Sequence, residues 1–283
     1  MKDNFSNPMQ FKSFIKKSAQ RNQVTPQLFL QEVVLDNLLE KISVSKYRDN
    51  LILKGGFLIA SIIGVDTRST MDMDTTIVGL PLDGQRLFEV FSEICQQSLL
   101  NDIIKLVPTK IEPIRKDDEY GGYRLHIDAQ IYTLRPTIKV DISTGDKITP
   151  AAIVYRHKLL TENRTIDVMS YNLETIVAEK METIIARGIN NTRPKDFYDA
   201  YAFDKLEFNN LDFSLLRQAL ANTASHRGTV ELLADYQQVI IEIETDEQMK
   251  QRWRNYQRTK PYANDIDFSA TCRALKELYQ KVN

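Results

Sequence analysis

The alternation of apolar and polar residues between Tyr123 and Tyr132 is the feature that most constrains how this chain can fold. Every second residue of the run is apolar or aromatic: Tyr123, Leu125, Ile127, Ala129 and Ile131. Successive side chains of a strand point to opposite faces, so this run predicts a strand with one buried face. The chain must therefore contain a sheet whose apolar face is covered by another layer.

The same kind of pattern predicts the other elements of the first half. Strands are predicted at residues 51–54, 71–78, 103–106 and 137–143, and helices at 57–63 and 82–99. The first forty-five or so residues read as helical, with Thr25 as a cap and Pro26 in the first turn. From about Tyr171 onward strand signals vanish and amphipathic helices dominate. We therefore predict an α+β protein with one domain at residues 1–165 and a helical domain at residues 166–283.

Composition excludes several classes of protein. Hydrophobic residues make up 42% of the chain and charged residues 27%, which is the balance of a soluble globular protein. No apolar run approaches the roughly 18 residues that span a bilayer, and the N-terminus has no apolar signal core. These features predict a cytoplasmic protein without membrane contact. The net charge of −1 gives no general support to nucleic-acid binding.

Cysteine and histidine usage makes a zinc site improbable. The two cysteines, Cys95 and Cys272, lie far apart in helix-like contexts and are expected to be reduced core thiols. The three histidines have no metal-ligand spacing. His126 sits in the alternating strand and is expected to be structural, whereas His157 and His226 lie in polar stretches and are expected to be exposed.

The most informative segment is the strand at 71–78, which carries Asp72 and Asp74. These side chains point to the same face, with Cα atoms about 6–7 Å apart. Two such carboxylates repel each other unless a cation lies between them, and hard oxygen ligands select Mg²⁺ or Mn²⁺. Asp141, in the apolar strand at 137–143, offers a third carboxylate. If the two strands are neighbours, the three acids could hold two metals for phosphoryl or nucleotidyl transfer. The alternative is a solvated pair of acids at a strand end.

Lys54-Gly55-Gly56 ends one predicted strand and opens a predicted helix. Backbone N–H groups at a helix start can cradle phosphates, and glycine allows a nucleotide to approach closely. The alternative is a tight turn without a ligand.

The helical half carries a lysine in an unusual position. Lys180 lies four residues from both Ile176 and Ile184, inside the apolar stripe of a helix predicted at 173–187. It must snorkel to solvent, pair with an acid, or reach into a polar cleft. Further on, Pro194 fits the first position of a helix, and Asp196 then lies in its first turn, where the helix dipole favours an acid.

A stretch near the C-terminus mixes basic and aromatic residues. Its members are Lys250, Arg252, Trp253, Arg254, Tyr256, Arg258, Lys260 and Tyr262. Such a mixture suits contact with an RNA backbone and stacking on bases. The alternative is an exposed amphipathic helix whose aromatic residues pack inward.

Four motifs in order resemble those of a known family. They are Lys54-Gly55-Gly56, the run from Arg68 to Asp74, an Ala-Glu-Lys helix ending at Lys180, and an Arg-x-Lys-Asp-x-x-Asp helix from Arg193 to Asp199. The chain resembles the DNA polymerase β-like nucleotidyltransferase superfamily and, within it, the AbiEii/AbiGii toxins of bacterial abortive-infection and toxin–antitoxin systems. The resemblance implies a small mixed sheet with flanking helices, followed by a helical domain.

One position departs from the wider superfamily. Gly56 stands where a Gly-Ser pair is common, so its missing hydroxyl leaves nucleotide contacts to the backbone. Thr70 is a candidate to supply a replacement hydroxyl.

The resemblance also implies residue roles. The enzyme would move a nucleoside monophosphate from an NTP to an acceptor hydroxyl and release pyrophosphate. Asp72 and Asp74 would bind both metal ions, and Asp141 would hold the one that activates the acceptor. The triphosphate site would comprise Lys54, Gly55, Gly56, Arg68, Thr70 and Lys180. Asp196 would support catalysis, with Asp199 as a candidate second acid.

The partners that the family implies are an RNA acceptor, with the tRNA 3′ end as one candidate, and a cognate antitoxin protein. Two other functions stay open. One is a nucleotidyltransferase that modifies a small molecule such as an antibiotic. The other is a catalytically idle module that binds an NTP or a partner, against which the presence of all three acids argues.

Overall fold

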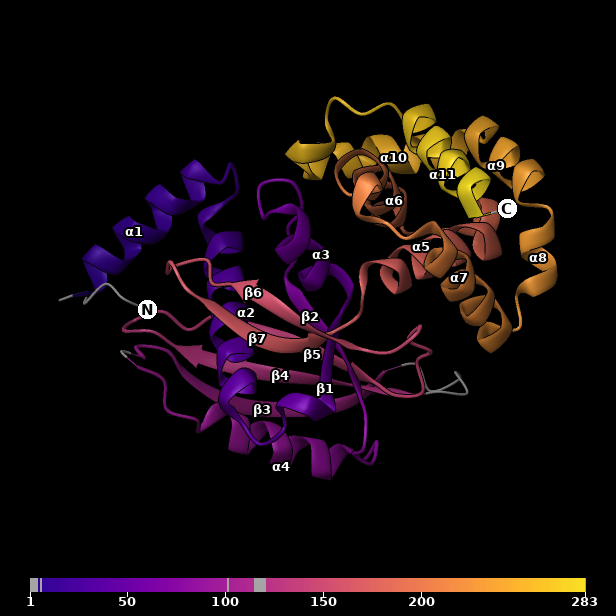
Figure 1. The fold of residues 1–283 in the computed structure, drawn as a ribbon. Helices are drawn as coiled ribbons and strands as arrows, with labels where there is room; N and C mark the ends of the chain where they lie inside the picture. Colours follow the sequence, from indigo (N-terminus) through magenta and orange to yellow (C-terminus); the bar gives the residue numbers. More distant parts are fainter. Residues whose placement is uncertain (1–4, 6, 101, 115–120, 283) are drawn as a thin grey trace. The chain divides into compact units, whose positions relative to one another are not determined.

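The chain folds into a mixed sheet with flanking helices, followed by a helical part, in a computed structural model that describes residues 5, 7–100, 102–114 and 121–282. Two compact units result (Figure 1). The sheet unit comprises residues 1–146 and 153–170, and the helical unit comprises residues 147–152 and 171–283. The expected boundary at residue 165 coincides with the first residue of the last strand, so the sheet unit runs to Ser170.

The sheet has seven strands in the order β3-β4-β5-β2-β1-β7-β6. They are β1 (Leu51–Lys54), β2 (Asp72–Ile77), β3 (Lys105–Ile114), β4 (Gly122–Gln130), β5 (Thr137–Ser143), β6 (Ile153–Lys158) and β7 (Thr165–Ser170). Strand β2 pairs with β5 in parallel and β1 with β7 in parallel, while the other neighbours are antiparallel. The central strands β1, β2 and β5 therefore carry both kinds of pairing.

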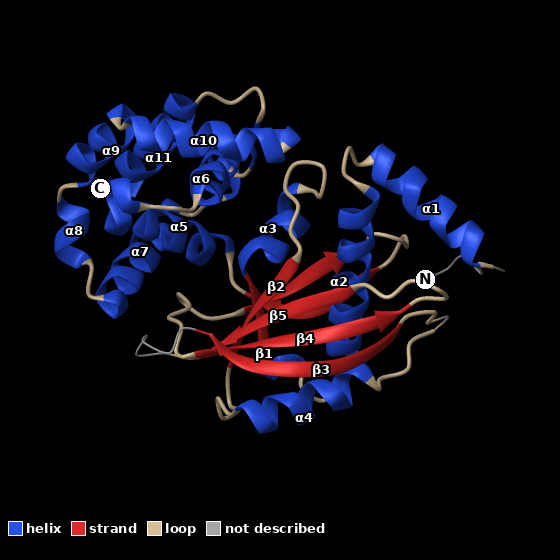
Figure 2. Ribbon diagram, turned by 180° about the vertical axis from the view of Figure 1, so that it is seen from behind, coloured by secondary structure: helices blue, strands red, loops and turns tan. Residues whose placement is uncertain are grey.

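Four helices belong to the sheet unit: α1 (Pro8–Arg21), α2 (Pro26–Val44), α3 (Gly55–Ile63) and α4 (Gly84–Cys95). Helix α2 contacts β5, β7 and α4. Helix α4 lies along β3, as Figure 2 shows. Alternate residues of β4 and β5, such as Leu125, Ile127 and Val140, are fully buried. The apolar face that the sequence demands is thus covered by helices, and the opposite face of β4 and β5 carries polar side chains such as Arg124 and Asp141.

The helical unit is built from amphipathic helices. They are α5 (Leu173–Arg187), α6 (Pro194–Leu206), α7 (Phe213–Arg227), α8 (Val230–Ala234), α9 (Tyr236–Thr245), α10 (Glu247–Thr259) and α11 (Phe268–Val282). Helix α5 packs on α6 and α7, and α11 packs on α6. Across the residues that the structure describes, no helix is long and apolar enough to cross a membrane.

The predicted fold class is confirmed, with local differences. Thr25 caps α2 as predicted, its Oγ1 accepting a hydrogen bond from the N–H of Leu28 at 3.2 Å. Residues 1–4 and 6 of the predicted N-terminal helical region lie outside the described part. The strand predicted at 103–106 is the start of the longer β3, and the helix predicted at 82–99 ends at Cys95. Strands β6 and β7 were not predicted. Cys95 and Cys272 are free and buried, as expected, and burial raises the pKa of each thiol to about 12.

The expectation that His157 is exposed is wrong. His157 is only 3% exposed, and its Nε2 lies 2.5 Å from Oδ1 of Asp36 on α2. Its Nδ1 lies 2.7 Å from Oγ of Ser61 on α3, and that hydroxyl lies 2.8 Å from the hydroxyl of Tyr155. Although the sequence around His157 is polar, its side chain is buried and joins α2 and α3 to β6. Its hydrogen bonds, rather than exposure to water, satisfy its polar atoms.

We predict that His157→Phe destabilises the sheet unit by about 3 kcal/mol or more, because Asp36 is left buried without its partner. Denaturation followed by circular dichroism, with amide exchange in α2 and β6, measures the loss. His126→Phe is the matched control, since His126 bonds Glu112, which is 39% exposed. That control is expected to cost about 1 kcal/mol or less. Equal stability losses in both variants would contradict a special role for His157.

Candidate active site

A row of charged residues crosses the polar face of the sheet. The strand register aligns Lys54 of β1 with Asp74 of β2, Asp74 with Asp141 of β5, and Asp141 with Arg124 of β4. Neighbouring strands lie about 4.8 Å apart, so two like charges stand side by side at the centre with a cation at each end. The strands of Asp74 and Asp141 are neighbours, which meets the condition set from the sequence for bringing the acids together.

Arg124 neutralises one of the two central acids. Its Nε and Nη2 each donate a hydrogen bond of 2.7 Å to one carboxylate oxygen of Asp141. The hydrogen bond to Asp141 raises the pKa of Arg124 above its ordinary value, and the charge of Asp72 adds to the rise. Sequence analysis missed Arg124, because its position on the polar face of β4 gains meaning only from the register with β5.

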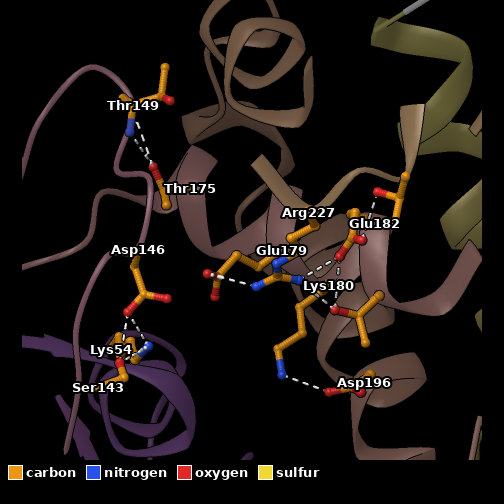
Figure 3. A network of polar contacts seen from close by, with 12 residues as sticks. Lys54, Ser143, Asp146, Thr149, Thr175, Glu179, Lys180, Glu182, Asp196 and Arg227 are labelled. Atoms are coloured by element: carbon orange, nitrogen blue, oxygen red, sulfur yellow. Dashed lines mark hydrogen bonds and ion pairs between the residues drawn. The ribbon is translucent and has the colours of Figure 1, made fainter. Parts of the chain in front are cut away.

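The ammonium group of Lys54 binds two side chains at the end of β5 and just after it. Its Nζ donates to Oγ of Ser143 at 2.8 Å and to Oδ2 of Asp146 at 2.7 Å, as Figure 3 shows. Ser143 also donates to Asp146 at 2.7 Å. The lysine that ends β1 therefore anchors the segment after β5 through its ion pair with Asp146.

Asp74 lies against the start of α3. Its Oδ2 accepts a hydrogen bond from the N–H of Gly56 at 3.3 Å. Gly55 has a φ of +66°, and a Cβ at that residue would meet Oδ2 of Asp74 at 2.1 Å. Only glycine satisfies both demands, since the left-handed region and the close approach each disfavour a side chain. The Gly55-Gly56 turn and the acidic strand are thus one local structure.

Thr70 lies where the missing side chain of Gly56 would point. A Cβ at Gly56 would come within 3.1 Å of Oγ1 of Thr70 and 3.3 Å of Nη2 of Arg68. The N–H of Thr70 is held by Oε1 of the buried Glu32 at 2.8 Å. The structure therefore brings Gly55, Gly56, Arg68 and Thr70 together around Asp74, which is the grouping expected for a triphosphate site.

Of the three acids on this face, Asp72 has the fewest contacts that offset its negative charge. Its carboxylate forms no hydrogen bond or ion pair with the described residues. Burial raises the pKa of Asp72 above its ordinary 3.8, and the charges of Asp141 and Asp74 add to the rise, against Lys139 and Arg124. A carboxylate in this state favours a proton or a cation.

The donor set at this face suits a divalent metal ion in its chemistry. Asp72 and Asp74 share a strand face, and carboxylate oxygens are the ligands that Mg²⁺ and Mn²⁺ prefer. In the described part of the chain, no three Asp, Glu, His or Cys side chains form a group that could hold a metal ion. Asp141, the third acid expected from the sequence, has both carboxylate oxygens bound by Arg124.

The remaining predicted residues meet in the helical unit. Lys180 of α5 lies 2.8 Å from Oδ1 of Asp196 and 3.0 Å from Oδ2 of Asp199, both on α6 (Figure 3 draws the first contact). Arg193 adds a contact of 3.4 Å to Asp196. Burial would lower the pKa of Lys180, but the two carboxylates outweigh it and the pKa lies above its ordinary value. Of the three outcomes considered for Lys180, pairing with acids is the one observed.

The basic and aromatic stretch packs as the alternative described. Trp253 is 2% exposed, and its Nε1 donates to the carbonyl of Ile266 at 2.9 Å. The hydroxyls of Tyr256 and Tyr262 lie 3.0 Å apart, and the ring of Tyr262 packs on Tyr198. Trp253 is thus part of the core of the helical unit, whereas Tyr256 and Tyr262 are half-buried and contact each other and Tyr198.

Comparison with solved structures places this fold in a class. The chain is similar to a crystal structure entitled "putative nucleotidyltransferase from H. pylori", with a TM-score of 0.50 and 15% identity over 92% of this chain and 96% of that one. It also matches the structure of JHP933 from Helicobacter pylori, with a TM-score of 0.49 and 15% identity over 91% and 92% of the two chains. At this identity the first likeness shows a shared fold alone.

The sequence itself identifies the family. A family model described as "Nucleotidyl transferase AbiEii toxin, Type IV TA system" matches residues 37–280. The chain therefore belongs to the AbiEii nucleotidyltransferase toxin family, as the motifs indicated. Comparison with curated protein sequences gives no significant match.

We predict that Asp72→Asn raises the melting temperature of the metal-free protein near neutral pH. A carboxyl group whose pKa is raised by folding stabilises the fold only while protonated, so ionised Asp72 opposes folding at neutral pH. The gain should shrink as the pH falls and vanish below 3.8, the ordinary pKa of the group. Thermal melts across this range measure it. Asp128→Asn, at an exposed acid on β4, is the control and should change stability little. A lower melting temperature for Asp72→Asn at neutral pH would contradict the prediction.

A second prediction concerns the helical unit. Lys180→Met should destabilise it by about 3–5 kcal/mol, because the buried carboxylates of Asp196 and Asp199 lose the ammonium group that both contact. The loss should diminish as the pH falls, since protonation removes the repulsion. Trp253 is the only tryptophan of the chain and lies in this unit, so its fluorescence during denaturation reports the change. Lys250→Met is the control, because Lys250 pairs with a Glu247 side chain that is 77% exposed. Equal effects of both substitutions would show that the buried cluster contributes nothing special.

Proposed function

We propose that this chain transfers a nucleoside monophosphate from an NTP to a hydroxyl group of an RNA acceptor and releases pyrophosphate. Membership of the AbiEii nucleotidyltransferase family supports a transferase. The single observation that carries the proposal is the contact between Asp74 and the Gly55-Gly56 turn. It joins an acidic strand to a helix start, and that combination suits a triphosphate and the cations that accompany it.

The residues of the sheet unit have separate tasks in this proposal. The N–H groups at the start of α3, with Arg68 and Thr70, bind and orient the triphosphate. Asp72 and Asp74 would hold Mg²⁺ or Mn²⁺, which when bound supplies positive charge to the phosphates and lowers the pKa of an attacking hydroxyl. Asp141 would join this set less readily than the other two, because Arg124 holds both its oxygens.

In the helical unit we assign Lys180 as a cationic contact for the triphosphate and Asp196 as the residue that fixes its position. The ion pairs with Asp196 and Asp199 keep Lys180 protonated despite its burial. We place Asp199 with Asp196 as a positioning residue rather than a group that touches substrate.

The acceptor and the biological setting follow from the family rather than from the site. The family name describes a toxin of a type IV toxin–antitoxin system, so we propose that a cognate antitoxin protein counters this chain. RNA, with the 3′ end of tRNA as a candidate, fits growth arrest as the outcome. The rival small-molecule acceptor is distinguished by where the transferred nucleotide is found.

We predict that an NTP labelled at the α-phosphate transfers label to total RNA in the presence of Mg²⁺ or Mn²⁺. Asp72→Asn and Asp74→Asn should each reduce the rate by about 100-fold or more, which is the usual loss when a charged catalytic group is removed. Asp128→Asn should retain the activity of the unaltered protein. Transfer at an undiminished rate by either Asp72→Asn or Asp74→Asn would overturn the site assignment, and label on a small molecule alone would overturn the RNA acceptor.

A further inference from the structure

A pocket of about 490 Å³ opens at the end of the sheet where the central strands β2 and β5 begin. Its polar lining comes from Gln27 and Gln31 of α2, Asp72 of β2, Lys139 of β5 and Arg135 in the turn before β5. This volume lies in the range of pockets that accept small organic ligands, so one nucleotide can enter. The pocket belongs to the sheet unit alone, and sequence analysis assigned none of these residues except Asp72.

The charges of the pocket suit an anionic group. Lys139 is half-buried beside Asp72, its register partner across β2 and β5, and its ammonium forms no hydrogen bond or ion pair with the described residues. Arg135 is exposed and uses Nη1 to hold the carbonyls of Tyr132 and Leu134 at 2.8 Å. A guanidinium has five N–H donors, so most of its donors are left for a ligand. The first turn of α2 adds the positive end of a helix dipole.

The pocket lies on the other flank of the carboxylate pair from the Gly55-Gly56 turn. Asp74 touches that turn, whereas Asp72 lines the pocket two residues earlier on the same face of β2. A triphosphate bound at the turn and a second ligand in the pocket would therefore meet at the two acids. This separation is what a transferase needs, because donor and acceptor must approach from different directions for an in-line displacement.

We infer that the pocket binds the terminal nucleotide of the RNA acceptor, with its phosphate on Lys139 and Arg135 and its free sugar hydroxyl beside Asp72. This inference rests on the proposed function. A strand terminus carries an anionic phosphate and a hydroxyl on one sugar, which matches two cations and one carboxylate in a single pocket. A protein hydroxyl would bring no phosphate for the two cations, and a neutral small molecule would leave both unused.

The chemistry balances in this arrangement. The acceptor hydroxyl oxygen forms a bond to the α-phosphorus of the NTP, and the bond from that phosphorus to the bridging oxygen of the β-phosphate breaks. Pyrophosphate leaves with the electron pair, and the hydroxyl proton is released to solvent water. Lys139 and Arg135 act on the acceptor alone and fix its position.

The test compares two matched double variants. Arg135→Gln with Lys139→Gln removes the two cations of the pocket, and Arg156→Gln with Lys158→Gln removes one arginine and one lysine from exposed positions on β6. Both carry the same net charge. Binding of a short single-stranded RNA, labelled at its 5′ end, is measured by fluorescence anisotropy over a range of salt concentrations, and NTP binding is measured separately by calorimetry.

We expect the pocket variant to bind RNA about 10-fold to 100-fold more weakly, as loss of charge-assisted phosphate contacts implies. The slope of log affinity against log salt should flatten by about 0.7, because the two cations neutralise one phosphate. NTP affinity should stay within about twofold, and the β6 variant should resemble the unaltered protein in both assays. In transfer assays the KM for RNA should rise in the pocket variant while kcat is retained.

Three outcomes would overturn the inference. One is unchanged RNA affinity in the pocket variant, and another is an equal loss in the β6 variant, which would indicate general charge. The third is a parallel loss of NTP affinity, which would assign the pocket to the donor. None of these touches the proposed function, which fails separately if the unaltered protein transfers no nucleotide. RNA binding that depends on Arg135 and Lys139 would still support the pocket in that case.

Discussion

The repulsion between Asp74 and Asp141 is the constraint on which the rest of this site depends. The parallel register of β2 and β5 places the two acids side by side, about 4.8 Å apart at the backbone. Arg124 reduces this repulsion, because it donates a hydrogen bond to each carboxylate oxygen of Asp141. Lys54 aligns with Asp74 in the register but gives its charge to Asp146 instead. The less compensated negative charge therefore lies on Asp74 and Asp72, where it can attract a cation that accompanies a phosphate ligand.

The local backbone follows from the same charge. Asp74 turns toward α3 and accepts the N–H of Gly56, and this approach leaves no space for a side chain at Gly55. Thr70 then occupies the direction that a side chain at Gly56 would take, so a hydroxyl returns to the site from another segment. The hydroxyl that lies beside Gly56 thus comes from a residue fourteen positions away in the sequence. Sequence motifs indicated the grouping, but only the structure shows which atoms force it.

The parts of the fold that sequence predicted were those with a local signal. Alternation marked β4 and β5, and the acids of β2 were found because two carboxylates two residues apart in a strand need an explanation. Strands β6 and β7 were missed, since four of the six residues of β6 are exposed and no alternation of burial marks it. Arg124 and His157 were missed for another reason. Their roles depend on partners on β5, α2 and α3, and no local pattern encodes a pairing between distant segments.

His157 also shows that residues of a catalytic type can be joined by hydrogen bonds without forming a catalytic site. Ser61, His157 and Asp36 are joined in sequence by hydrogen bonds, in the order that nucleophilic hydrolases use. Ser61, however, lies inside α3, where N–H groups beyond the first turn bond to carbonyls of the helix and are unavailable to stabilise an oxyanion. His157 is buried, and a second hydroxyl, that of Tyr155, already contacts Ser61. The network therefore joins α2, α3 and β6, and by joining them it supports the helix start at which Asp74 meets the Gly55-Gly56 turn.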